Sequence, residues 1–330
     1  MARILSRADV QRCLTMSEAI EAMRLAFGAL STGRAQLPQR LAVDLPEEGV
    51  ALLMPSLVQT PEEHAFGLKL ITVMPQNPRR NLPRSYASVL LIDVTTGKTL
   101  TILEGGWLTA MRTGAASGLA TDLLARKDAD VLVLFGAGAQ APMQAFAIHT
   151  VRPLREIRVV NQNDDHYQQL VSTLHDLLGA SCPPIHRVTT SRAALAGASL
   201  VACATASTAP LFSLDDISPG THINAIGAFT PTMCEVDPIT LSHARIVVDQ
   251  REATLAEAGD LIQALASGYI SGPETWTELG EIVSSTKPAR QTPDEITLFK
   301  SVGVAAQDAM VAQHVYRRAC ELGVGIEVEV

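Results

Sequence analysis

The sequence predicts an α/β fold: a doubly wound, mostly parallel sheet that follows a separate α+β domain. Two observations predict this class. Near the middle of the chain, the apolar run at residues 131–135 (VLVLF) leads directly into the segment GAGAQA at 136–141. After it, short apolar runs alternate with helical segments, as expected for parallel strands joined by right-handed helical crossovers. The residues before the run are numerous enough to form a domain of their own.

Composition supports a packed protein with a small-molecule partner. The chain has 330 residues, of which 47% are apolar and 4% aromatic, and this is enough for two domains with their own cores. The net charge is −8 with no basic block, so we expect no nucleic-acid partner and no anionic membrane surface. The first residues carry charges where a signal peptide needs an apolar run, and we expect a cytoplasmic protein.

Cysteine and histidine spacing predicts no metal and no disulfide framework. The five cysteines are scattered without a C-x-x-C pair, which indicates reduced thiols. The eight histidines show neither the H-x-x-x-H nor the H-E-x-x-H spacing of metal ligands.

The first part of the chain predicts one amphipathic helix and then a β-rich segment. Residues 17–33 have apolar side chains at Ile20, Met23, Leu25 and Phe27, and Gly33 suits the helix end. A hairpin turn is expected at residues 95–97 (TTG). Expected strands lie at residues 40–43, 50–54, 67–73, 87–93 and 99–104.

The second part alternates between strands and helices. A long helix rich in small residues, from about 107, leads into the strand at 131. Further strands are expected at 157–160, 200–204, 223–226 and 246–248, and helices at 164–179 and 191–197. We expect a last helix, about 303–322, to return to the first domain. The expected domains are therefore residues 1–112 with 303–330, and residues 113–302.

The segment at 136–141 matches the pattern G-x-G-x-x-G/A of a dinucleotide-binding turn. Gly136 allows a tight turn, Gly138 lets the backbone approach a pyrophosphate, and the small Ala141 lets helix and strand pack closely. Free N–H groups and the positive end of the helix dipole favour the phosphate. This glycine turn, residues 136–141, predicts a nucleotide cofactor.

The residue that follows the second strand of the nucleotide-binding segment, at 157–160, influences whether NAD or NADP binds. An acid there accepts from the ribose 2′-hydroxyl and favours NAD, whereas a neutral residue admits the 2′-phosphate of NADP. Here the strand ends in Asn161-Gln162-Asn163, which repels no phosphate, although Gln162 supplies no positive charge. We predict NADPH as the preferred cofactor, with NADH usable. Asn161 could instead cap the following helix, and the two roles are compatible.

Several further sequence segments together resemble the pattern of one protein family. They are LTAMRT at 108, GAGAQA at 136, ATAS at 204, HINAIGAFTP at 222, VVD at 247, EAGDL at 257, ELGE at 278 and LFKSVG at 298. In this order, from about residue 15 to 322, the chain resembles the ornithine cyclodeaminase/mu-crystallin family. The resemblance implies a substrate-binding and dimerisation domain, a Rossmann domain, NAD(H) or NADP(H), and a homodimer. It also implies chemistry at an imine beside a carboxylate.

The resemblance assigns expected roles to matching positions. Arg40 resembles an arginine that meets the substrate carboxylate, Lys69 a substrate-contacting lysine, and Arg112 an arginine between that carboxylate and the cofactor. Catalytic candidates are Lys69, Arg112 and, on the final helix, Asp308. Positions expected to bind the cofactor are Gly136, Gly138, Ala139, Gln140, Asn161, Gln162, Asn163, Ser207 and Ala228. Phe229 and Val302 are expected at the substrate.

One departure from the family pattern concerns Phe229. Similar cyclodeaminases carry an acid at this place, whereas this chain reads Gly227-Ala228-Phe229. Phenylalanine exchanges no proton, and such acid–base help is typically worth about 10²–10⁴ in rate. The string G-A-F-T-P resembles instead the ketimine reductases of the family. The sequence thus favours NAD(P)H-dependent reduction of pyrroline-2-carboxylate to L-proline or of piperideine-2-carboxylate to L-pipecolate.

Other interpretations stay open at this point. The chain could be an amino-acid dehydrogenase or a cyclodeaminase, or a nucleotide-binding protein of the mu-crystallin type. Lys69, expected to have a lowered pKa because two arginines accompany it, is the candidate proton donor; Asp308 is an alternative acid or a partner of it. Taken singly, Arg40 and Lys69 could face solvent, Arg112 could be an ordinary helix residue, and Phe229 could pack in the core. Asp249 is expected to cap a helix and Asp260 to stabilise the fold.

Overall fold

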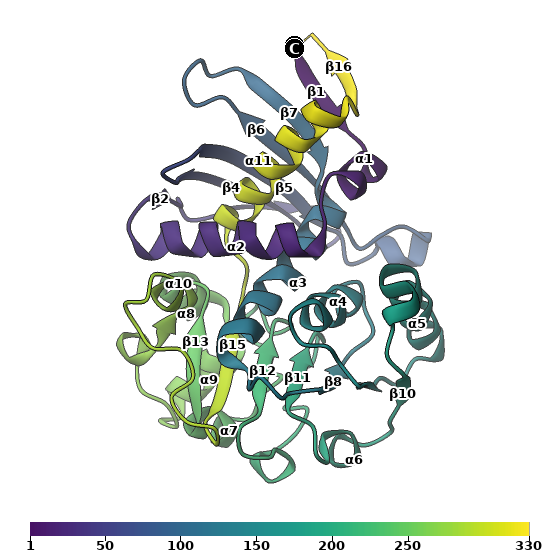
Figure 1. Ribbon diagram of the computed structural model, residues 1–330, viewed down its shortest axis with the longest axis vertical. Coiled ribbons are helices and arrows are strands. Elements are labelled where there is room, and N and C mark those ends of the chain that lie inside the picture. Colours follow the sequence, from purple (N-terminus) through teal and green to yellow (C-terminus); the bar gives the residue numbers. More distant parts are fainter. Residues whose placement is uncertain (330) are drawn as a thin grey trace. The chain divides into compact units, whose positions relative to one another are not determined.

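The computed structural model describes residues 1–329 (Figure 1), and the chain divides into two compact units. One unit comprises Met1–Arg112 with Val304–Val330, and the other comprises Thr113–Gly303. No helix within residues 1–329 is long and apolar enough to cross a membrane.

The first unit is built on a mixed sheet with the strand order β16-β1-β7-β6-β5-β4-β2, and β3 pairs with β4. Helices α2 and α11 pack against each other, and both contact β4 (Figure 1). The strands are β1 (Ala2–Leu5), β2 (Ala35–Gln36), β3 (Leu41–Leu45), β4 (Gly49–Gln59), β5 (His64–Val73), β6 (Ser85–Ile92), β7 (Thr99–Glu104) and β16 (Ile326–Val328). The helices are α1 (Arg7–Arg12), α2 (Met16–Ser31), the short 3-10 turn η1 (Asn77–Arg80) and α11 (Ala305–Leu322), with α3 (Gly105–Leu124) running into the second unit.

Alternation along β5 places one set of side chains under α11. A Cβ on Gly67 would lie 3.0 Å from the Cβ of Ala309, so the helix rests directly on the strand there. Lys69, two residues on, shares this face, because successive side chains of a strand point to opposite faces. Leu68 and Leu70 therefore lie on the other face, where Leu70 is 44% exposed.

The second unit is a parallel sheet with the order β10-β9-β8-β11-β12-β15-β13-β14. Its strands are β8 (Val131–Phe135), β9 (Glu156–Val160), β10 (Ile185–Arg187), β11 (Leu200–Cys203), β12 (His222–Ala225), β13 (Ala244–Val248), β14 (Thr277–Glu278) and β15 (Ile296–Lys300). Its helices include α4 (Ala141–Val151), α5 (Asp164–Leu178), α6 (Ser191–Leu195), α7 (Pro238–His243), α8 (Arg251–Glu257), α9 (Gly259–Ala266) and α10 (Leu279–Val283).

Burial on both faces explains the apolar run that the sequence displays. Val131, Val133 and Phe135 enter one apolar cluster, while Leu132 and Leu134 enter another. Strands covered on both faces read as continuous hydrophobic runs rather than as alternating ones. The predicted α/β class, with a mostly parallel sheet and a mixed sheet, is confirmed.

Several boundaries differ from the expected ones for identifiable reasons. Strand β4 continues past the predicted end at 54 and contains Pro55. Its pairing with β3 ends at Leu53 and that with β2 begins at Leu57, so the proline, which lacks an N–H, falls in the gap between two partners. The strands β1, β2, β10, β14, β15 and β16 were not predicted, and of these β2, β10, β14 and β16 have at most three residues. Leu25, expected on the apolar face of α2, is 41% exposed.

Candidate functional site

A buried charged cluster lies in the first unit, where β5, α3 and α11 meet. The Nζ of Lys69 forms an ion pair with Oδ2 of Asp308 at 2.7 Å. The Nε of Arg112 donates to Oδ1 of the same carboxylate at 3.1 Å. All three side chains are almost fully buried, with 2%, 6% and 1% exposure for Lys69, Arg112 and Asp308. We call these residues, with Gln307, the Asp308 cluster. The solvent-facing alternative for Lys69 is therefore excluded.

Gln307 is a member of this cluster that sequence analysis missed. Its Oε1 accepts from Nη1 of Arg112 at 2.7 Å and from the backbone N–H of Val304 at 3.0 Å. The glutamine thus caps the start of α11 and orients the guanidinium at the same time. The sequence carried little signal for it, because a capping box pairs a Gln or Glu at this position with Ser or Thr at the N-cap, and the N-cap here is Val304.

The surroundings of Lys69 lower its pKa to about 8. Burial is the largest cause, since it penalises the ammonium form, and the nearby charge of Arg112 adds to it. Asp308 acts in the opposite direction, and the charge of Arg40 lowers the pKa further. The predicted direction is confirmed, but the main cause is burial rather than the two arginines.

The charge balance of the cluster favours an anionic ligand. Two cations, Lys69 and Arg112, share one carboxylate, Asp308, in a buried setting, and Arg40 lies half-buried just before β3 within electrostatic range of Lys69. An uncompensated buried positive charge is costly unless an anion pairs with it. A guanidinium binds a carboxylate through two parallel hydrogen bonds. The cluster can therefore bind a carboxylate and present an ammonium proton beside it.

In the second unit, the glycine turn has the geometry expected for a pyrophosphate. Gly136 has a φ of 94°, and a Cβ there would lie 2.6 Å from the carbonyl oxygen of Ala204. A Cβ on Gly138 would meet no atom within 4 Å, so nothing in the protein itself requires glycine at that position. Within residues 1–329, the N–H groups of Gly138, Ala139 and Gln140 donate to no protein acceptor, and no side chain caps α4. These groups fit an anion at the helix N-terminus.

The expected ribose segment follows β9. The Oδ1 of Asn161 accepts from the backbone N–H of Asn163 at 3.0 Å, and Asn163 caps α5 by accepting from His166 at 2.9 Å. The alternative interpretation of Asn161 as the helix cap is therefore wrong, because Asn163 occupies that position; Gln162 is exposed. Arg187, at the end of β10, donates its Nε–H to the carbonyl of Asn161 at 3.0 Å and pairs with Asp164. This cation was not predicted, because it lies on another strand, 26 residues further along the chain.

The remaining expected residues lie on loops at the carboxyl ends of other strands. Ser207 follows β11, Ala228 and Phe229 follow β12, and Val302 follows β15. Phe229 is 51% exposed, which excludes core packing. Val302 donates its N–H to Oδ2 of Asp249 at 2.9 Å, and this oxygen also accepts from the N–H of Gly303.

Two acids of the second unit have structural partners. Asp249 was expected to cap a helix, but it chiefly anchors the loop at 301–303, including the Ser301 hydroxyl at 2.8 Å. Asp260 accepts from the backbone and pairs with Lys300 at 2.7 Å, consistent with its expected stabilising role. Among residues 1–329, no three His, Cys, Asp or Glu side chains gather as a metal site would require.

The parallel doubly wound sheet and the glycine turn together define a Rossmann-type dinucleotide-binding fold. The profile of the ornithine cyclodeaminase/mu-crystallin family matches residues 1–322. The chain belongs to this family.

Three relatives match nearly the full chain. A Delta(1)-pyrroline-2-carboxylate reductase of Bacillus cereus is 35% identical over 328 residues, which is 99% of each chain. The structure of the Delta(1)-pyrroline-2-carboxylate reductase of Thermococcus litoralis, in complex with NADH and L-proline, has a TM-score of 0.92 and 37% identity, and covers 99% of this chain and 100% of that chain. An archaeal alanine dehydrogenase dimer with bound NAD has a TM-score of 0.90 and 31% identity, covering 99% of each chain.

Proposed function

We propose that this protein is an NAD(P)H-dependent reductase of cyclic ketimine acids, acting on Δ1-pyrroline-2-carboxylate to give L-proline and/or on Δ1-piperideine-2-carboxylate to give L-pipecolate. The observation that carries the proposal is the buried Lys69, whose pKa is about 8, beside Arg112 and Asp308. It combines a proton donor with a carboxylate site, as this reaction requires. Relatives with the reductase activity, similar over the whole chain, support it.

In the proposed reaction, Arg112 and Arg40 hold the substrate carboxylate, which fixes the ring and its imine carbon. The Lys69 ammonium donates its proton to the imine nitrogen, and Asp308 keeps that ammonium charged. The nicotinamide cofactor, when bound, supplies the hydride that the imine carbon accepts. One hydride and one proton convert the C=N bond to CH–NH, so the step balances without a metal.

Phe229 distinguishes this proposal from cyclodeamination. A cyclodeaminase needs a group that exchanges protons with the amine and the departing ammonia, and an exposed phenyl ring cannot do so. The buried Asp308 cluster, with Lys69 and Arg112 both present, also favours an enzyme over a protein that only stores a nucleotide. Oxidation of an open-chain amino acid is the remaining alternative, because a relative of similar length is named alanine dehydrogenase.

We propose that NADPH is preferred and that NADH is also used. Gly136, Gly138, Ala139 and Gln140 would hold the pyrophosphate. Asn161, with Gln162 and Asn163, would meet the ribose. The neutral Asn161 repels no 2′-phosphate, and the guanidinium of Arg187, which is hydrogen-bonded to its carbonyl and also pairs with Asp164, lies beside it. Arg187→Ala should raise the KM for NADPH and leave that for NADH nearly unchanged. Equal changes for both cofactors would contradict this assignment.

We propose a homodimer formed through the first unit. The face of its sheet opposite α11 carries a row of apolar side chains from adjacent strands, since Leu68 pairs with Leu90 and Leu90 with Ile102. Leu70 on the same face is 44% exposed, and Leu41 of β3 is 60% exposed. Contiguous exposed apolar surface marks interaction sites. Leu68→Glu should yield a monomer by light scattering after size exclusion; an unchanged dimer mass would locate the interface elsewhere.

The direct test mixes the purified protein with NADPH and each cyclic ketimine and follows the loss of nicotinamide absorbance. Oxidation with the five- or six-membered imine, and formation of the L-amino acid, are expected. If neither imine is reduced, the reductase proposal fails. Pyruvate with ammonia, and ornithine with NAD, are the parallel assays for the alanine dehydrogenase and cyclodeaminase alternatives.

A further inference from the structure

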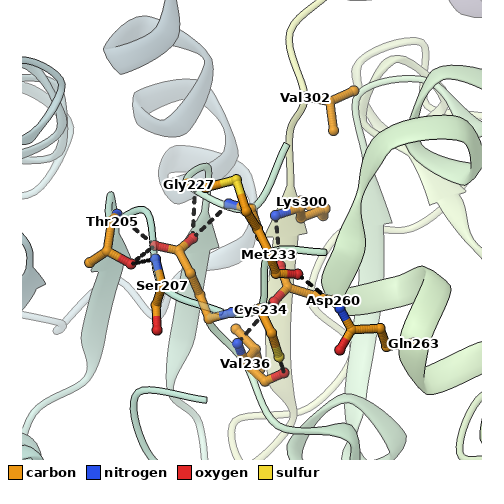
Figure 2. Close-up of polar contacts among 12 residues, drawn as sticks. Thr205, Ser207, Gly227, Met233, Cys234, Val236, Asp260, Gln263, Lys300 and Val302 are labelled. Atoms are coloured by element: carbon orange, nitrogen blue, oxygen red, sulfur yellow. Dashed lines mark hydrogen bonds and ion pairs between the residues drawn. The ribbon is translucent and has the colours of Figure 1, made fainter. Parts of the chain in front are cut away.

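A fully buried carboxylate in the second unit joins two loops that are separate in sequence. Glu235 has 0% exposure. Its Oε1 accepts from the backbone N–H and from the hydroxyl of Thr205, at 2.6 and 2.8 Å. Its Oε2 accepts from the N–H groups of Gly227 and Ala228, at 2.7 and 3.1 Å. Thr205 and Gly227, which donate to this carboxylate, are labelled in Figure 2.

The two loops lie where the second half of a dinucleotide would bind. Thr205 follows β11 and Gly227 follows β12, and both strands run parallel to β8, whose carboxyl end carries the glycine turn. The sheet order reverses between β8 and β11, since β9 lies on the other side of β8. In such sheets a dinucleotide spans this switch point, so the adenosine half lies over β9 and the nicotinamide half over β11 and β12.

The two loops are packed so closely at Gly227 that no side chain fits between them. A Cβ on Gly227 would lie 2.3 Å from Oε1 of Glu235 and 2.3 Å from the carbonyl oxygen of Thr205. A second buried layer holds Glu235 itself, because Oδ1 of Asp260 accepts from its backbone N–H at 2.5 Å. Asp260 in turn pairs with Lys300 at 2.7 Å (Figure 2).

Four hydrogen-bond donors converge on one carboxylate, and such donors bind a charged oxygen more strongly than a neutral one. The pKa of Glu235 is raised, with burial as the largest cause, while the charge of Lys300 and the hydrogen bonds from Thr205 oppose the shift. An amide at this position would keep only one acceptor oxygen, so two of the donors would lose their partner. The geometry therefore needs glutamate, and not merely a side chain of its size.

We infer that Glu235 is a positioning residue: it fixes the loops after β11 and β12 and so sets the nicotinamide end of the cofactor site without contacting the cofactor. This inference rests on the proposed function. It predicts a defect confined to one half of the dinucleotide, which a general loss of stability would not produce.

The test compares two ligands bound to Glu235→Gln in the absence of substrate. ADP-ribose carries the adenosine and pyrophosphate of the cofactor but no nicotinamide. We expect the Kd for NADH, measured by calorimetry, to rise about tenfold or more, equivalent to about 1.4 kcal/mol. The Kd for ADP-ribose should stay within about twofold, a difference of about 0.4 kcal/mol. Equal weakening of both ligands, or no weakening, would overturn the inference.

Two further variants keep the test decisive. Thr121→Val removes a different buried hydrogen bond of the same unit, between Thr121 and Asn224 at 2.9 Å, and should lower the melting temperature while leaving both affinities unchanged. Thr205→Val removes the hydroxyl that contacts Glu235 and keeps the side chain's shape. If Glu235→Gln does not fold, Thr205→Val should still weaken NADH and not ADP-ribose; wild-type NADH binding by it would refute the inference.

Measuring NADH binding and ketimine turnover separately distinguishes a failure of this inference from a failure of the proposed function. A wild-type protein that binds NADH but reduces no ketimine would sink the reductase proposal and leave the binding comparison intact. Conversely, a wild-type reductase whose Glu235→Gln variant binds NADH normally would refute only the role of Glu235.

Discussion

Asp308 should control the pH range in which the enzyme works, and Asp308→Asn tests this. The substitution keeps an oxygen that can accept from Nε of Arg112, at the position now 3.1 Å away, and removes only the negative charge beside Lys69. That charge is the largest influence that raises the pKa of Lys69, against burial and Arg112. Without it, the ammonium form of Lys69 loses its counter-ion in a buried site.

The magnitude follows from the 2.7 Å ion pair. At an effective dielectric constant of about 20, two unit charges at that distance attract by roughly 6 kcal/mol, and about 1.4 kcal/mol corresponds to one pKa unit. Rearrangement of the cluster and entry of water recover much of this energy. We therefore expect the pKa of Lys69 to fall from about 8 by at least ~1 unit.

The assay is the pH dependence of kcat/KM for ketimine reduction. Lys69 donates a proton, so activity is present below its pKa and is lost as the pH rises through it. Wild-type activity should decline near pH 8. In Asp308→Asn the decline should move to about 7 or lower, which costs roughly fivefold at pH 8 and little at acidic pH.

A control variant separates this effect from general damage. Asp260→Asn removes the acid from another buried pair, Lys300–Asp260 at 2.7 Å, and should lower stability while leaving the alkaline decline near its wild-type pH. If Asp308→Asn loses activity equally at every pH, with the decline still near 8, Asp308 does not set the protonation of Lys69.

Three other predictions concern the second unit. Gly138→Ala should keep the wild-type melting temperature, because a Cβ there meets no atom within 4 Å, yet weaken NADH binding at least tenfold (~1.4 kcal/mol), as calorimetry would measure; unchanged affinity would remove Gly138 from the cofactor site. Phe229→Asp should not release ammonia efficiently from ornithine, since an acid alone lacks supporting groups, and robust release would show that only this acid was missing. Burial lowers the pKa of His222 to about 3, so the folded state binds its proton less readily than the unfolded chain. Stability should therefore fall as the pH drops from about 6.5 towards 3, and His222→Gln should flatten this dependence in denaturant titrations; an identical slope would refute it.

Local features of the second unit could be predicted from the sequence. The strand at Val131–Phe135 and the glycine turn are determined within a few residues, because a strand buried on both faces must be apolar and a φ of 94° at Gly136 favours glycine. The hairpin turn before β7 is local in the same way, with Asp93 accepting from the N–H groups of Thr95 and Thr96.

The family strings carried the prediction further than spacing alone. They singled out Arg40, Lys69 and Arg112, none of which stands out by residue type or periodicity. They did not determine what these residues touch. The ion pair of Lys69 with Asp308 joins β5 to α11, and only the folded first unit brings those elements together.

Only the tertiary structure decided which buried polar side chains contact one another. Gln307 orients Arg112, Arg187 lies beside Asn161 and Glu235 joins two loops, and each of these contacts links segments far apart along the chain. No local pattern encodes them, because a buried charge is satisfied by whichever donors the packing of distant elements delivers. The sequence by itself determined the class of fold, the glycine turn and the fact that position 229 carries a phenylalanine, Phe229, and no acid. The structure decided which charges are buried together, and so which lysine holds a pKa near 8.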